Sequence, residues 1–177
     1  MKTIFAKNSE YDARVMWSML KSLDPAGVVN RARTMKIGDE LLTMISTVQN
    51  YEEAKDAIEK VVWERHADEE QITDKAVSDY QKTWDEINDI FYNEVENITG
   101  VPWEFSEYRV VVSPFHRGIS NRGKNVVACD AYEDPNAQKR KIAHEILMVQ
   151  MWYIFDSKYL ESKEGSSWGS LFGHLTK

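Results

Sequence analysis

Residues 141–155 read KIAHEILMVQMWYIF, and this stretch decides the interpretation of the chain. Gln150 is the only polar residue among the ten from Ile146 to Phe155. A run of this length is too short to cross a bilayer, which takes about 20 apolar residues. A helix that is apolar on every side is instead buried in a protein core. Because Pro135 suits the first position of a helix, the sequence predicts a long buried helix that begins near Pro135.

Two runs rich in β-branched residues precede this helix. Tyr108–Ser113 reads YRVVVS and stops at Pro114, and Asn125–Ala131 reads NVVACDA. Such runs, bounded by Pro and Gly, are typical of strands. The segment between them, PFHRGISNRGK, contains two glycines. We therefore expect a hairpin or a small antiparallel sheet.

The first half of the chain has the apolar spacing of helices. Ser9 opens a predicted helix that ends before Pro25, a short helix follows Pro25, and another is expected after Gly38. Residues 52–66 and 74–97 place apolar side chains three and four positions apart, which predicts two amphipathic helices. Their expected core side chains are Ala57, Ile58, Val61, Tyr80, Trp84, Ile87 and Phe91.

These patterns predict an α+β fold in one domain. The 177 residues are enough to bury a substantial core. We expect a mainly helical part over residues 1–100, followed by a part over residues 103–177. The second part contains the small sheet and the buried central helix.

Composition excludes several classes of function. The net charge is −7, which disfavours a general nucleic-acid binder. Residues 37–102 contain seventeen acidic and five basic side chains, a net charge of −12, which is typical of the solvated faces of long helices. No apolar run is long enough for a membrane span, and no secretory signal is visible, so we expect a cytoplasmic protein. The single cysteine, Cys129, excludes an internal disulfide and is interpreted as a buried structural thiol.

One chemical motif stands near the start of the apolar stretch. Zinc peptidases use HExxH on a helix, where the two imidazoles at i and i+4 share a zinc ion. The Glu after the first His acts as general base on the metal-bound water. Here His144 and Glu145 occupy the first two positions, but the i+4 position is Met148, and a thioether is a poor zinc ligand.

In this setting, residues 103–160 resemble the zincin metallopeptidases, in particular the glutamate-zincins, with a degenerate motif, HEILM. The matching pieces are YRVVVSPF, NVVACDAY and KIAHEILMVQMWYIF. In that family a small, mainly antiparallel sheet precedes the motif helix, and a downstream helix supplies a third ligand, usually Glu. The resemblance implies that His144 is a zinc ligand and Glu145 the general base. Glu161 and Glu164 are the candidates for a third ligand.

Other interpretations of these residues stay open. His116 and His174 could complete a three-imidazole site with His144 if the fold brings them together. His144 is otherwise a structural histidine at the helix. Glu145 is otherwise a first-turn carboxylate that complements the helix dipole, or a partner of Lys141 one turn earlier. His66 is interpreted as a solvated helix residue.

Three functional hypotheses follow. The first is a zincin-like pseudoenzyme that holds no zinc and acts by binding a protein or peptide. The second is an active zinc-dependent hydrolase with an atypical ligand set. The third is an unrelated α-rich interaction protein whose acidic helices contact a basic partner.

Overall fold

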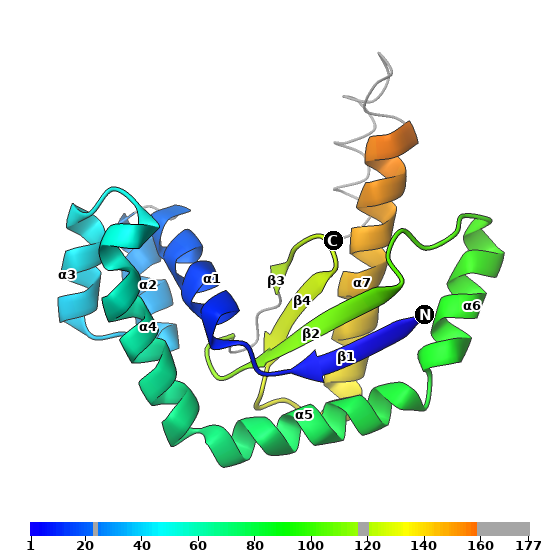
Figure 1. The fold of residues 1–177 in the computed structure, drawn as a ribbon, viewed down its shortest axis with the longest axis horizontal. Coiled ribbons are helices and arrows are strands. Elements are labelled where there is room, and N and C mark those ends of the chain that lie inside the picture. Colours follow the sequence, from blue (N-terminus) through cyan, green and yellow to red (C-terminus); the bar gives the residue numbers. More distant parts are fainter. Residues whose placement is uncertain (23–24, 117–120, 159–177) are drawn as a thin grey trace.

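The computed structural model describes residues 1–22, 25–116 and 121–158, and this part of the chain forms seven helices and four strands (Figure 1). The elements run in the order β1 (Lys2–Ala6), α1 (Ser9–Ser22), α2 (Pro25–Met35), α3 (Asp39–Thr47), α4 (Tyr51–Asp68), α5 (Glu70–Asp85), α6 (Asn88–Thr99), β2 (Glu107–Ser113), β3 (Asn121–Arg122), β4 (Val126–Asp130) and α7 (Pro135–Lys158). The predicted α+β class with a mainly helical first half is confirmed.

The four strands form one sheet in the order β1-β2-β4-β3. β1, β2 and β4 are parallel, and the register aligns Phe5 with Val110 and Val110 with Val127. These three side chains are buried on one face of the sheet. β1 begins at the second residue and was not predicted.

The predicted antiparallel pairing of the two β-rich runs is wrong, because β2 and β4 lie side by side in parallel. In a hairpin the chain reverses its direction once between two strands, so the two strands pair antiparallel. Instead that segment contains β3, and β3 makes the antiparallel pair with β4. A tight turn joins β3 to β4, and in it the Gly123 nitrogen donates to the Val126 carbonyl at 2.7 Å.

Residues 51–99 form three helices rather than the expected two. α4 and α5 meet at Glu69, and the predicted helix over 74–97 is divided between α5 and α6. Ile87 leaves helical geometry at the break, with φ −120° and ψ −8°. No Gly or Pro marks this position. Because Ile87 and Phe91 both still pack against the core, their spacing concealed the break.

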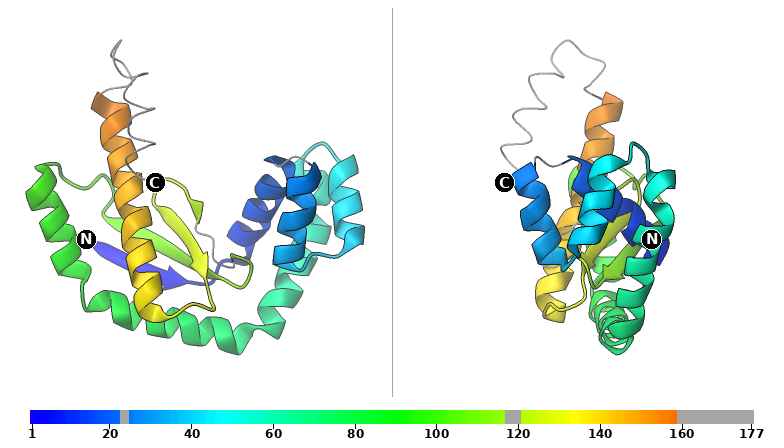
Figure 2. Two further views of the ribbon diagram at one scale, coloured as in Figure 1. Left: turned by 180° about the vertical axis from the view of Figure 1, so that it is seen from behind. Right: turned by 90° about the vertical axis from the view of Figure 1, so that its left-hand side faces the viewer.

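The core consists of two clusters of buried side chains. One lies between the sheet, α5 and α7 and contains Trp84, Tyr108 and Ile146. The other holds α1–α4 together and includes Ile58, and Phe115 enters it from beyond the end of β2. Figure 1 shows α1–α4 as an arm beside the sheet, with α5 running from the lower end of α4 beneath the sheet. Seen from behind in Figure 2, α7 crosses the face of the sheet.

None of the helices within the described ranges combines the length and the apolar composition that a membrane crossing requires.

Candidate functional site

The His-Glu pair lies on α7, the helix that follows the last parallel strand, β4. α7 begins as expected for its sequence: Asp134 Oδ1 accepts hydrogen bonds from the backbone nitrogens of the first turn, and Pro135 needs no such bond. His144 is exposed and Glu145 is half-buried, whereas Met148, one turn after His144, is 6% exposed. The thioether is therefore a buried packing group.

The other candidate ligands do not assemble with His144 in the described part of the chain. Glu161, Glu164 and His174 lie outside the described residues. His116 is buried beside Asp12, and no described contact joins it to His144. Within the ranges that the structure describes, no group of three or more His, Cys, Asp or Glu side chains is placed to hold a metal ion.

Lys141, the expected partner of Glu145, bonds elsewhere. Its ammonium group donates to both carboxylate oxygens of Glu133 at 2.6 Å. This pair ties α7 to the segment that follows β4.

A groove runs along the last described turns of α7. We call it the α7 groove; its volume is about 480 Å³, and it is lined by Glu104 and Phe105, by the turn residues Gly123 and Lys124, and by Val149, Trp152 and Tyr153. Tyr153 is 38% exposed. The nearby Glu104 carboxylate raises the pKa of the Tyr153 hydroxyl. The groove therefore combines aromatic faces with one acidic and one basic side chain.

Gln150, the one polar residue of the apolar stretch, holds the backbone of the groove residue Glu104 against α7. Its side chain is buried, donates to the Pro102 carbonyl at 2.9 Å, and accepts from the Glu104 nitrogen at 3.2 Å. Phe105 packs edge-on against Tyr108, with ring centres 5.8 Å apart. Buried polar groups need such partners, so these bonds fix the segment before β2 against α7.

A second cluster of polar side chains lies where the helical arm meets the sheet. The Asp12 side chain on α1 is fully buried, and its Oδ2 lies 2.8 Å from His66 Nε2 on α4. Its Oδ1 lies 3.4 Å from His116 Nε2, just beyond the end of β2. Asp12 is thus placed between two imidazoles that come from different parts of the fold. Beside them, the Arg65 guanidinium stacks over the ring of Phe115.

Sequence reasoning missed this cluster. The interpretation of His66 as solvated is wrong, because its side chain is only 12% exposed and bonds to Asp12. The helix predicted to open at Ser9 begins there, and Asn8 caps it by accepting a bond from the Tyr11 nitrogen at 2.9 Å. Asp12 and His66 are 54 residues apart, so no local pattern could have paired them.

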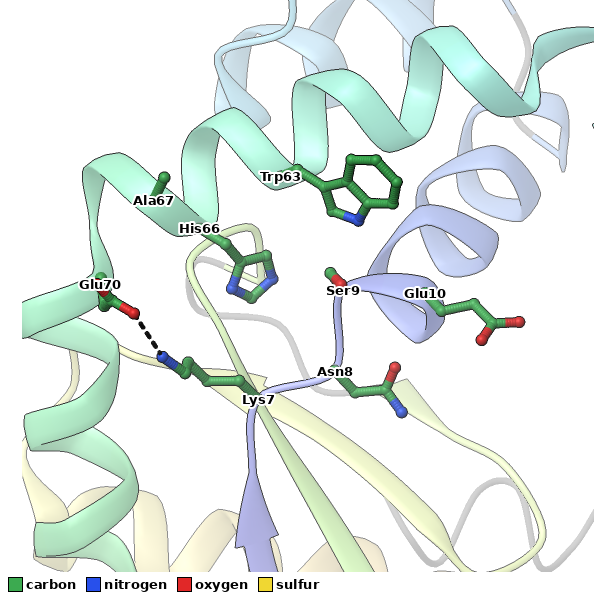
Figure 3. A pocket seen from close by; sticks show the side chains of 8 residues that line it. All are labelled: Lys7, Asn8, Ser9, Glu10, Trp63, His66, Ala67 and Glu70. Carbon is green, nitrogen blue, oxygen red and sulfur yellow. Dashed lines mark hydrogen bonds and ion pairs between the residues drawn. The ribbon is translucent and has the colours of Figure 1, made fainter.

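A pocket opens directly beside this cluster, and Figure 3 shows it from close by. We call it the α4 pocket; it has a volume of about 530 Å³. It is lined by Lys7 and Asn8 of the turn between β1 and α1, by Ser9 and Glu10 at the start of α1, and by Trp63, His66, Ala67 and Glu70. His66 and Trp63 both project from α4 toward the β1–α1 turn (Figure 3). Trp63 is 57% exposed, which is unusual for so large an apolar surface.

Cys129 is fully buried within β4, which confirms the prediction of a structural thiol. Burial raises the pKa of this thiol well above its ordinary value. The thiol is therefore protonated at neutral pH and is not a candidate nucleophile.

The fold and these sites define an α+β, mainly helical protein with a small mixed sheet. No protein-family model matches the chain, and neither a curated protein nor a solved structure matches it. The resemblance to zincins therefore stays a prediction from the sequence.

Proposed function

We propose that the protein is zincin-like and acts by binding a protein or peptide in the α7 groove, without standard zinc peptidase activity. The proposal rests on a difference between two neighbouring parts of α7: one lacks a zinc ligand, and the next lines a groove. The position where HExxH has its second imidazole is occupied by the buried Met148, while the following turns present Trp152 and Tyr153 to a groove.

The chemistry of the groove suits a short peptide segment. Aromatic side chains bury a large apolar area at little entropic cost and dominate the energetics of binding sites. Phe105 and Tyr153 would hold an apolar side chain of the peptide. Lys124 and Glu104 would orient it through flanking charges of opposite sign.

Selection from a random peptide library on the immobilised protein tests this proposal. We expect enrichment of peptides that carry an apolar anchor beside charged residues. By fluorescence anisotropy, Tyr153→Ala and Lys124→Glu should each weaken the selected peptide about tenfold, an effect that corresponds to about 1.4 kcal/mol. The matched control is Ile98→Ala on α6, which is 81% exposed and lies outside the groove. A peptide whose affinity is unaffected by the groove variants, or a library without enrichment, would contradict the proposal.

Metal analysis distinguishes the zinc-dependent alternative. Protein purified without chelators or a metal column should retain less than one zinc per chain after dialysis. Stoichiometric zinc that disappears in His144→Ala would favour an active hydrolase with ligands other than Met148.

A further inference from the structure

The α4 pocket contains a histidine whose ring is held in place by a buried carboxylate. His66 Nε2 lies 2.8 Å from Asp12 Oδ2, and we infer that Nε2 is the donor of this hydrogen bond, because a carboxylate oxygen accepts. In the neutral imidazole the other nitrogen, Nδ1, then has a free lone pair. No hydrogen bond joins Nδ1 to another residue in the described ranges, and His66 is part of the pocket wall.

Trp63 supplies a flat apolar surface next to this acceptor. Trp63 and His66 are three residues apart on α4, a spacing that places two side chains on the same face of a helix. Figure 3 shows both of them on the side of α4 that faces the β1–α1 turn. Because more than half of Trp63 is exposed, its ring can stack on a ligand in the pocket.

The charged groups around the pocket are already paired within the protein. The Lys7 ammonium lies 3.4 Å from Glu70, as the dashed line in Figure 3 shows, and 2.6 Å from Asp74. Glu10 pairs with Arg14 at 3.2 Å. A charged ligand would have to compete with these pairs, so the pocket suits a neutral compound.

We propose that the α4 pocket binds a neutral, hydroxylated ring compound. Its ring stacks on Trp63, and one of its hydroxyl groups donates a hydrogen bond to His66 Nδ1. The volume of about 530 Å³ lies within the range of small-molecule sites, about 300–1,000 Å³. Nucleosides and sugars both supply this chemistry. The pocket and the α7 groove have no lining residue in common, so this site is additional to the proposed peptide site.

Nitrogen NMR of the imidazole rings in the intact protein tests the first half of the proposal. The four histidines give few signals, and His66→Gln assigns the one of interest. We expect a protonated Nε2 and an unprotonated Nδ1 at neutral pH. A protonated Nδ1 at neutral pH, with Nε2 protonated or not, would overturn the proposal, because that nitrogen could not accept a hydrogen bond.

Titration with adenosine and, separately, with methyl glucoside tests the second half. We expect one of the two probes to shift the Nδ1 signal in a saturable manner, and the responding probe identifies the ligand class. Trp63→Ala should weaken that binding about tenfold, because ring stacking on an aromatic side chain is lost. The control His144→Gln should leave it unchanged, since His144 is exposed on α7. Trp63→Ala replaces an exposed residue, so the variant is expected to fold.

The proposal fails if neither probe binds more tightly than about 10 mM. It also fails if the responding probe binds the Trp63→Ala variant as tightly as the parent. Failure of either kind leaves the peptide experiments on the α7 groove unaffected, because those variants lie on other elements.

Discussion

Gln81 on α5 hydrogen-bonds to the backbone of Phe5 in β1, with its Oε1 lying 3.0 Å from the Phe5 nitrogen. The same amide donates to the Thr3 carbonyl at 3.1 Å, and Asn88 donates to the Met1 carbonyl. β1 lies at one edge of the sheet. Exposed edges can pair with strands of other chains. These side-chain amides therefore take the place of a further strand.

Replacement of Gln81 should both destabilise the fold and expose this edge. Gln81→Ala leaves the backbone groups of Thr3 and Phe5 without protein partners, which should lower the free energy of unfolding by about 1–3 kcal/mol. Denaturant unfolding measures this loss, and size-exclusion chromatography should show more self-association. Gln71→Ala, an exposed glutamine on the same helix, is the control and should change neither quantity.

Trp84 is expected to dominate the stability of the sheet cluster. It is fully buried, packs against Phe5 and Phe91, and donates its indole N–H to Asn88 at 3.0 Å. Trp84→Ala should lower the free energy of unfolding by about 3–5 kcal/mol, because it leaves a large cavity. The matched variant Trp63→Ala removes an exposed ring, and its effect should stay within about 0.5 kcal/mol. If Trp84→Ala and Trp63→Ala lowered the free energy of unfolding equally, the buried position of Trp84 would be contradicted.

Met148→His tests whether α7 contains a latent zinc site. The variant restores the second imidazole one turn after His144, so it should bind zinc more tightly than the parent in calorimetric titration. Because Met148 is buried, the variant without metal should also lose about 1–3 kcal/mol of stability. Peptidase activity is not expected, since a third ligand and a shaped cleft are also needed. Equally weak zinc binding by two folded proteins would mean that His144 does not face a metal position.

The buried thiol and phenols should make the fold sensitive to alkali. Burial raises the pKa of Cys129 above its reference value of 9.0, and the pKa values of Tyr80, Tyr92 and Tyr108 above 10.0. At pH 7 these groups are protonated in both states and contribute no pH dependence. As the pH rises further, the unfolded chain loses protons that the folded chain retains, so stability falls.

Urea unfolding at pH 7, 8.5 and 10 measures this decline, which should be largest between the last two values. Cys129 should also resist a thiol reagent at pH 8 until denaturant is added. Rapid labelling of the native protein would contradict the described burial of the thiol.

The sequence alone determined the features that depend on local pattern. The helical first half followed from apolar spacing, and β2 and β4 followed from their β-branched runs. The start of α7 was predictable because Pro135 and the residues after it have local preferences that need no distant partner. The burial of Cys129 followed because a thiol within an apolar strand faces the core.

Only the tertiary structure decided how these elements combine. A strand does not encode the direction of its neighbour, so the sequence could not show that β2 pairs with β4 in parallel and that the short β3 makes the antiparallel pair with β4. The break at Ile87 was hidden because both helices pack against one core and keep the same spacing. Asp12, His66 and His116 meet because the arm folds back onto the end of β2, and contacts across such distances leave no periodic trace in the sequence.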